Sequence, residues 1–242
     1  YSKYLDNDID EKVSSVFSTI KKVFSFKNII FILFAVLLAS KTLVGSFMPF
    51  NYVVLAVASA FEVPLLLVLI SSIIGLAVTG NSSAIIMLVI FFLLYNLVTA
   101  IVNIEGINKK YTIFIKFVAS VGILQLVTSF ITGALFTELF QVLSSIILSG
   151  IIYLVTVTGM NVIINLKNGF VYTREESIMM ILTIAMLLSA FSPVSVLGFK
   201  LVEILALVLI LIYGWSNGAI LGSTAGLMLG LSYTILCDVS MS

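Results

Sequence analysis

Residues 83–103 read SAIIMLVIFFLLYNLVTAIVN, a stretch without one charged side chain. An α-helix needs about 20 predominantly apolar residues to cross the hydrocarbon core of a bilayer. The rest of the chain resembles this stretch, because 61% of its 242 residues are hydrophobic, only 10% are charged, and the mean hydropathy is +1.27. An ordinary soluble domain is roughly 45–50% apolar and about 25% charged. Lipid must therefore cover much of the apolar surface.

The apolar stretches recur with most of the charged residues between them, which predicts an all-α, polytopic transmembrane helical bundle of about nine spans. The segments should be helical because lipid offers no hydrogen-bond partners to open backbone groups, and the period-two alternation of a membrane β-barrel is absent. The expected segments are residues 28–47, 50–62, 65–80, 83–103, 111–132, 137–165, 176–192, 200–213 and 217–236.

Two regions follow from this map, a cytoplasmic lead-in at residues 1–27 and a transmembrane domain at residues 28–242. The lead-in is predicted to be an amphipathic helix, which would either lie on the membrane surface or simply precede the first span. Because the chain starts at Tyr1 and stops at Ser242, we expect it to be part of a longer protein. Nine crossings would leave its end outside the cell, so a tenth span is expected to follow.

The basic residues predict the orientation, since cytoplasmic loops carry an excess of Lys and Arg. If the amino terminus is inside and nine segments cross, only Lys41 and Lys200 lie outside, against ten basic residues inside. A single crossing at residues 50–80 would instead divide them six and six. The bias favours a break near Pro64, which forms either a crossing hairpin or a re-entrant loop. The inside set is Lys3, Lys12, Lys21, Lys22, Lys27, Lys109, Lys110, Lys116, Lys167 and Arg174.

The composition argues against most chemistry. There is no His, and the single cysteine, Cys237, can form neither an internal disulfide nor a metal site. The net charge of +1, without a basic patch, argues against nucleic-acid binding. We therefore expect no catalytic residue, no cofactor and no metal in this segment.

One carboxylate stands out. Glu62 lies beside Pro64 at the expected break, and a broken helix with a carboxylate can bind a cation. The simpler interpretation is a helix end. Three amides, Asn96, Gln125 and Asn161, are predicted to hydrogen-bond to neighbouring helices, with contact to a substrate as the alternative.

Glycine recurs at every fourth position in the last segment, at Gly218, Gly222, Gly226 and Gly230. Residues at this spacing lie near one face of a helix, and a face of nearly bare backbone lets another helix approach closely. The spacing predicts helix packing, either within the chain or between copies in a homo-oligomer.

Two stretches resemble a known family, the amino-terminal membrane region of stage II sporulation protein E. They are REESIM at residues 174–179 and GWSNGAILGSTAGLMLGL at residues 214–231. The first span after Phe26 and Lys27 and the turn at Met48, Pro49 and Phe50 also fit the layout of that family.

The resemblance implies a parent with about ten spans, a cytoplasmic linker that assembles at the division septum with a tubulin-like protein, and a metal-dependent serine/threonine phosphatase. That phosphatase activates the forespore sigma factor by dephosphorylating an anti-anti-sigma factor. The phosphatase and its metal-binding aspartates do not match any part of this chain, so no catalytic residue carries over. What carries over is a role in anchoring and localising the enzyme at the septal membrane.

The predicted function is therefore the membrane-anchoring domain of a sporulation phosphatase in a bacterial cell membrane, with the lipid bilayer and septal proteins as partners. A small-solute transporter or transporter subunit is the alternative, with Glu62, Pro64, Asn96 and Gln125 lining its site. A membrane-embedded enzyme acting on lipid or glycan is disfavoured by the lack of His and of acidic residues deep in a span.

Overall fold

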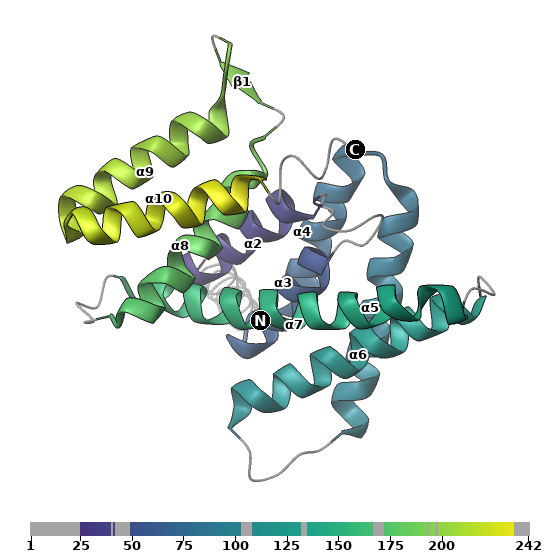
Figure 1. Ribbon diagram of the computed structural model, residues 1–242. Helices are drawn as coiled ribbons and strands as arrows, with labels where there is room; N and C mark the ends of the chain where they lie inside the picture. The colour runs from purple at the N-terminus through teal and green to yellow at the C-terminus, as the bar shows by residue number, and fades with distance from the viewer. Residues whose placement is uncertain are drawn as a thin grey trace, which may run out of the picture.

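The structure is a computed structural model that describes residues 25–39, 41, 49–102, 108–131, 135–166, 172–192, 194–196 and 198–234. Most of the predicted lead-in at residues 1–27 lies outside these residues, as does Cys237. In the described part, nine α-helices and one two-stranded hairpin follow one another (Figure 1). The helices are α2 (Phe26–Leu38), α3 (Pro49–Ala60), α4 (Leu65–Val78), α5 (Ser82–Ile101), α6 (Lys109–Ile131), α7 (Leu135–Asn165), α8 (Arg174–Ser189), α9 (Leu201–Asn217) and α10 (Ala219–Tyr233).

Each helix corresponds to one predicted apolar segment, so the all-α fold class is confirmed. The number of membrane crossings is a separate matter. Among the helices that the structure describes, three are long and apolar enough to cross a bilayer: α5, α6 and the part of α7 from Leu139. Helices α2, α3, α4 and α9 are apolar but shorter, and α3 has only 12 residues, about 18 Å at 1.5 Å per residue. Helix length therefore does not establish the nine crossings that the sequence predicts.

Helix α3 lies at the centre of the molecule. Its first ten residues, from Pro49 to Ala58, are all buried, and it packs against α2, α4, α5, α6 and α7. A chain of aromatic rings joins it to its neighbours, with Tyr52 4.5 Å from Phe91, Phe91 6.2 Å from Phe117, and Phe117 5.4 Å from Tyr153 between centroids. Each such pair adds roughly 0.5–1.5 kcal/mol beyond the burial of apolar area. These rings connect α3, α5, α6 and α7.

Helix α7 is the longest, at 31 residues, and runs across the molecule in Figure 1. It is long enough to pack against two partners in succession. Helix α6 lies along its first half, where Gly122 of α6 faces Ile146, and α8 lies along its second half, where Gly159 faces Thr183. Helices α5 and α7 cross rather than run parallel (Figure 1).

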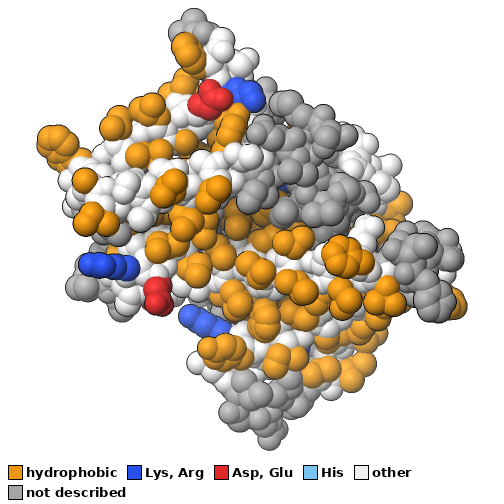
Figure 2. Space-filling view, viewed as in Figure 1, with side chains coloured by type: hydrophobic (Ala, Val, Ile, Leu, Met, Phe, Trp, Pro, Cys, Tyr) orange, Lys and Arg blue, Asp and Glu red, His pale blue; other side chains and the backbone are white. Residues whose placement is uncertain are grey.

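Helices α9 and α10 lie side by side and form a second apolar cluster with α8, which includes Ile181, Ala185, Leu188, Val202 and Leu229. A short hairpin precedes α9, in which β1 (Ser195–Val196) pairs antiparallel with β2 (Phe199–Lys200). Hydrophobic side chains cover much of the face seen in Figure 2, where charged side chains are few. An exposed apolar surface of this extent is typical of a protein that lipid surrounds.

Candidate functional site

The predicted break at Glu62 and Pro64 is a tight helix end. Helix α3 stops at Ala60, Glu62 takes a left-handed conformation with φ of 57°, and the Val63 amide donates to the Ala58 carbonyl at 2.9 Å. This is a Schellman motif, in which glycine usually takes the left-handed position. Pro64 then precedes α4, and its carbonyl accepts from the Leu67 amide at 3.1 Å. Asn51 near the start of α3 and Gly75 near the end of α4 both contact Ala39, so α4 runs back alongside α3.

The side chain of Glu62 forms an ion pair with Lys109 at the start of α6. The hydrogen bond and the charge of Lys109 hold the pKa of the Glu62 carboxyl below its usual range. Lys27 of α2 donates to the carbonyl of Phe61 at 2.7 Å. These two lysines join α2, the α3–α4 turn and α6 at one end of the molecule. Glu62 thus has a basic partner, and the described residues bring together no group of three His, Cys, Asp or Glu side chains that could hold a metal ion.

A second polar cluster forms where the β1–β2 hairpin meets α9 and α10. Lys200 donates to the Tyr233 hydroxyl at 2.9 Å, and this hydroxyl donates to Glu203 at 3.2 Å. Ser192, three residues before β1, accepts from Lys41, which follows α2, at 2.8 Å. The Lys41 bond thus joins the segment after α2 to the segment after α8, and the Tyr233 bonds join α10 to the start of α9.

Two of the three predicted amides, Asn96 and Asn161, form hydrogen bonds within their own helices. Asn96 is exposed on α5 and donates to the Phe92 carbonyl of its own helix at 2.7 Å. Asn161 of α7 is contacted by Asn165, one turn along the same helix. Gln125 is half-buried in α6, and its backbone carbonyl accepts from Thr128 at 2.8 Å. These bonds stay within a helix because the side-chain amides of Asn96 and Asn165, at exposed or half-buried positions, reach the carbonyl four residues back.

The interhelical polar contacts involve other residues. Asn51 is buried in α3 and donates to the Ala39 carbonyl, at the end of α2, at 2.7 Å. The Thr183 hydroxyl of α8 is buried and lies 3.2 Å from the Val155 carbonyl of α7 and 2.8 Å from the Met179 carbonyl. No motif in the sequence distinguishes Asn51 from the exposed Asn96, since both are single amides in apolar helices.

The four glycines at residues 218–230 do not share one contact. Gly218 lies between α9 and α10 with φ of 88° and makes the turn. A Cβ atom on Gly222 would lie 2.7 Å from the Gly214 Cα atom of α9, whereas one on Gly226 would lie 3.7 Å from Ile210 and one on Gly230 would meet nothing within 4 Å. A spacing of four residues exceeds one helical turn of 3.6 residues, so each successive glycine is rotated by about 40° around the helix axis. The later glycines of the row therefore turn progressively away from α9.

Two glycines that the sequence analysis did not single out make equally close contacts. A Cβ atom on Gly75 of α4 would lie 2.8 Å from the Ala39 Cβ atom, and one on Gly159 of α7 would lie 2.6 Å from the Met179 carbonyl oxygen. Gly75 follows Ser71 at the four-residue spacing of small residues that permits close helix packing in membranes. The close contact at Gly75 could therefore have been predicted from the sequence.

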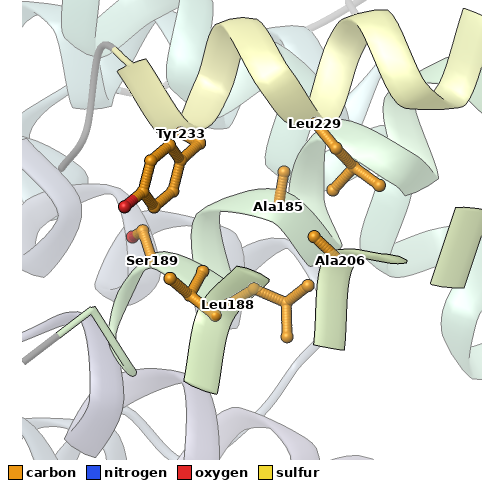
Figure 3. A pocket seen from close by; sticks show the side chains of 7 residues that line it. Ala185, Leu188, Ser189, Ala206, Leu229 and Tyr233 are labelled. Atoms are coloured by element: carbon orange, nitrogen blue, oxygen red, sulfur yellow. The ribbon is translucent and has the colours of Figure 1, made fainter. Parts of the chain in front are cut away.

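A small cavity lies between α8, α9 and α10 (Figure 3). Ala185, Leu188, Ser189, Ala206, Leu229 and Tyr233 point toward it. Its volume of about 20 Å³ is close to that of one water-sized sphere, whereas ligand pockets typically measure about 300–1,000 Å³. This cavity is a packing gap within the second apolar cluster.

The start of α8 carries one of the two stretches that resemble a known family. The Thr173 hydroxyl accepts from the Glu176 amide at 3.2 Å, and the Glu176 carboxylate accepts from the Thr173 amide at 3.0 Å. This capping box satisfies amides that a helix end otherwise leaves open. The second stretch, residues 214–231, contains the close Gly214–Gly222 contact between α9 and α10.

Comparison with known proteins gives one match. No curated protein and no solved structure shows significant similarity to the chain. The family model described as the SpoIIE N-terminal domain matches residues 2–241, nearly the whole sequence. The chain therefore belongs to the SpoIIE N-terminal domain family.

Proposed function

We propose that this chain is the multi-pass membrane anchor of a sporulation serine/threonine phosphatase, which it places at the division septum so that the phosphatase activates the forespore sigma factor. The observation that carries the proposal is the family match over residues 2–241, together with the apolar helices. In this proposal the segment itself catalyses no reaction and binds no cofactor.

The contacts at the helix ends support the proposed orientation. Lys27, Glu62 and Lys109 come together at one end, and charge counting places all three on the cytoplasmic side. Lys41 contacts Ser192, and charge counting places both outside. Ser192 and Lys200 belong to one connection, closed by the Leu201 amide, which donates to the Val194 carbonyl at 2.9 Å. The contacts thus join connections of the same predicted side, as a multi-pass protein requires.

Reporter fusions would test the orientation. A reporter inserted at Glu62 or at Asn108 is expected to be active only as a cytoplasmic protein, and one inserted at Gly80 or Gly198 only as an exported protein. The two glycines are exposed turn positions with positive φ, where an insertion disturbs little packing. Export of the Asn108 fusion would contradict the proposed map.

A domain exchange would test the role. The chain is replaced in its full-length parent by an unrelated multi-pass domain with the same orientation. We expect the phosphatase to remain in the membrane but to lose its enrichment at the septum, with loss of forespore sigma activity. Unchanged localisation and activity in the exchanged protein would contradict a localising role. Uptake of a small solute by vesicles that contain the purified chain would favour the transporter alternative.

A further inference from the structure

The last turn of α9 carries the single tryptophan of the sequence. Trp215 is 94% exposed, beside the exposed Ser216 and immediately before the turn at Gly218. The close contact of Gly214 with Gly222 lies on another side of α9 and holds α10 there. The indole ring therefore projects from the tip of the α9–α10 hairpin, away from the helix that packs against α9.

Trp215 continues an apolar stripe. Ile204, Val208, Leu211 and Trp215 recur at intervals of four, three and four residues, which puts them on one face of α9. All four side chains are exposed, and Leu207 and Ile212 widen the exposed face. Helix α10 adds Ile220, Leu227 and Leu231. Between its two ends, the hairpin thus presents an apolar surface without a charge.

The opposite end of the hairpin is polar. Lys200, Glu203 and Tyr233 form the hydrogen-bonded cluster described above, and the Lys200 ammonium also lies 5.5 Å from the centroid of the Tyr233 ring. From Leu201 to Asn217 the helix rises about 24 Å at 1.5 Å per residue. This length is at the short end of what spans a bilayer, whose hydrocarbon core is about 30 Å thick and thins locally around short helices.

We propose that the α9–α10 hairpin spans the membrane and that Trp215 anchors its tip in the lipid headgroup region, on the side opposite Lys200. This inference rests on the proposed membrane function. An indole ring has an apolar body and one N–H donor, so it is most stable at the boundary between acyl chains and headgroups. Lipid is the partner that fits, because the apolar face around Trp215 extends over the length of the helix without the polar rim of a protein interface. Charge counting puts this tip in the cytoplasmic leaflet.

The single tryptophan makes its fluorescence a direct probe. The purified chain is reconstituted into phosphatidylcholine–phosphatidylglycerol vesicles that contain lipid brominated either near the headgroup or near the end of the acyl chain. We expect the shallow bromines to quench Trp215 at least twofold more than the deep ones, and iodide in the water to quench it weakly. Stronger quenching by the deep bromines would overturn the proposal.

Two further outcomes separate this inference from the proposed function. If the chain floats with the vesicles but iodide alone quenches Trp215, the tip lies in water. If neither lipid nor iodide quenches it, a protein contact covers it. Either result would contradict the proposal that Trp215 anchors the hairpin in the headgroup region, without contradicting the proposed membrane function. A chain that does not float with the vesicles contradicts the membrane function itself.

A second variant calibrates the depth. In a Trp215→Phe background, Val208→Trp places the probe on the same exposed face about 10 Å further along α9. We expect the deep bromines to quench this probe more than the shallow ones, the reverse of the native chain. Equal profiles for the two positions would show that the hairpin lies flat and would overturn the proposal.

Discussion

Gly222 of α10 packs against Gly214 of α9 so closely that a Cβ atom on Gly222 would lie 2.7 Å from the Gly214 Cα atom. Backbone then meets backbone, and neither residue can move aside as a flexible side chain could. Gly230 lies on the same helix, two turns along, and faces open space. Substitutions at Gly222 and Gly230 can therefore distinguish packing of helices within the chain from packing between copies of the chain.

Gly222→Leu should destabilise the protein by about 1–3 kcal/mol or more, because the added side chain forces α9 and α10 apart. Gly230→Leu is the matched control and should leave stability nearly unchanged. Thermal unfolding of both purified variants in detergent measures the difference. If Gly230→Leu instead dissociates an oligomer while the fold stays intact, the glycine row serves contacts between copies.

Gly159→Ala should loosen α7 from α8, since the new methyl group would lie 2.6 Å from the Met179 carbonyl oxygen and 2.7 Å from the Thr183 Cβ atom. We expect a loss of about 1–3 kcal/mol in unfolding free energy. Gly150→Ala on the same helix is the control, because its methyl group would lie 3.5 Å from the Phe114 ring, an ordinary contact. Equal stability of the two variants would contradict the close approach of α7 and α8.

Asn51→Leu removes the hydrogen bond to Ala39 and leaves that carbonyl without its buried donor. Side-chain hydrogen bonds between membrane helices contribute about 0.6–2 kcal/mol, so we expect a loss of stability in that range. Asn96→Leu should be neutral, because Asn96 is exposed and donates only within its own helix. Denaturant unfolding of the two variants is the measurement, and a larger loss for Asn96→Leu would contradict the assignment.

The ion pair between Glu62 and Lys109 should make stability depend on pH. Its hydrogen bond and charge lower the folded-state pKa of Glu62 below the ordinary value of 4.5. The pair therefore stabilises the protein above that value, and this stabilisation is lost as the pH falls through the folded-state pKa. Both side chains are largely exposed, so the effect should be small and should weaken in salt.

The melting temperature of the native chain, followed from neutral to acidic pH, tests this prediction against Glu62→Gln. The variant lacks the titrating group at this site, so its melting temperature should fall less steeply between pH 4.5 and lower pH values. If the two curves are parallel throughout, the ion pair contributes nothing to stability in solution.

Apolar runs and charges were enough to predict the helices. Residues 83–103 form α5 at Ser82–Ile101, and residues 65–80 form α4 at Leu65–Val78. The distribution of lysines predicted a break near Pro64, and in the structure α3 ends at Ala60 while α4 begins at Leu65. Such features depend on local sequence, because lipid requires each apolar run to satisfy its own backbone hydrogen bonds.

Contacts between helices were not predictable in the same way. The pattern of glycines in α10 was visible, yet only the structure shows that Gly222 meets α9 and Gly230 does not. Likewise, Asn51 and Asn96 look alike in sequence, and only burial makes one an interhelical donor. In a membrane segment both the lipid-facing and the protein-facing positions are apolar. The amphipathic periodicity that marks the buried face of a helix in a soluble protein is therefore weak here.

The enclosure of α3 has a consequence for biogenesis. Of the five helices that surround it, only α2 precedes it in the chain, so α3 is synthesised before α4, α5, α6 and α7. A newly synthesised α3 must first contact lipid or the insertion machinery, and these contacts are later replaced by contacts with the neighbouring helices. The packing around α3 can therefore be completed only after Asn165 has been synthesised, and in shorter nascent chains α3 lacks some of the neighbours that bury it in the mature protein.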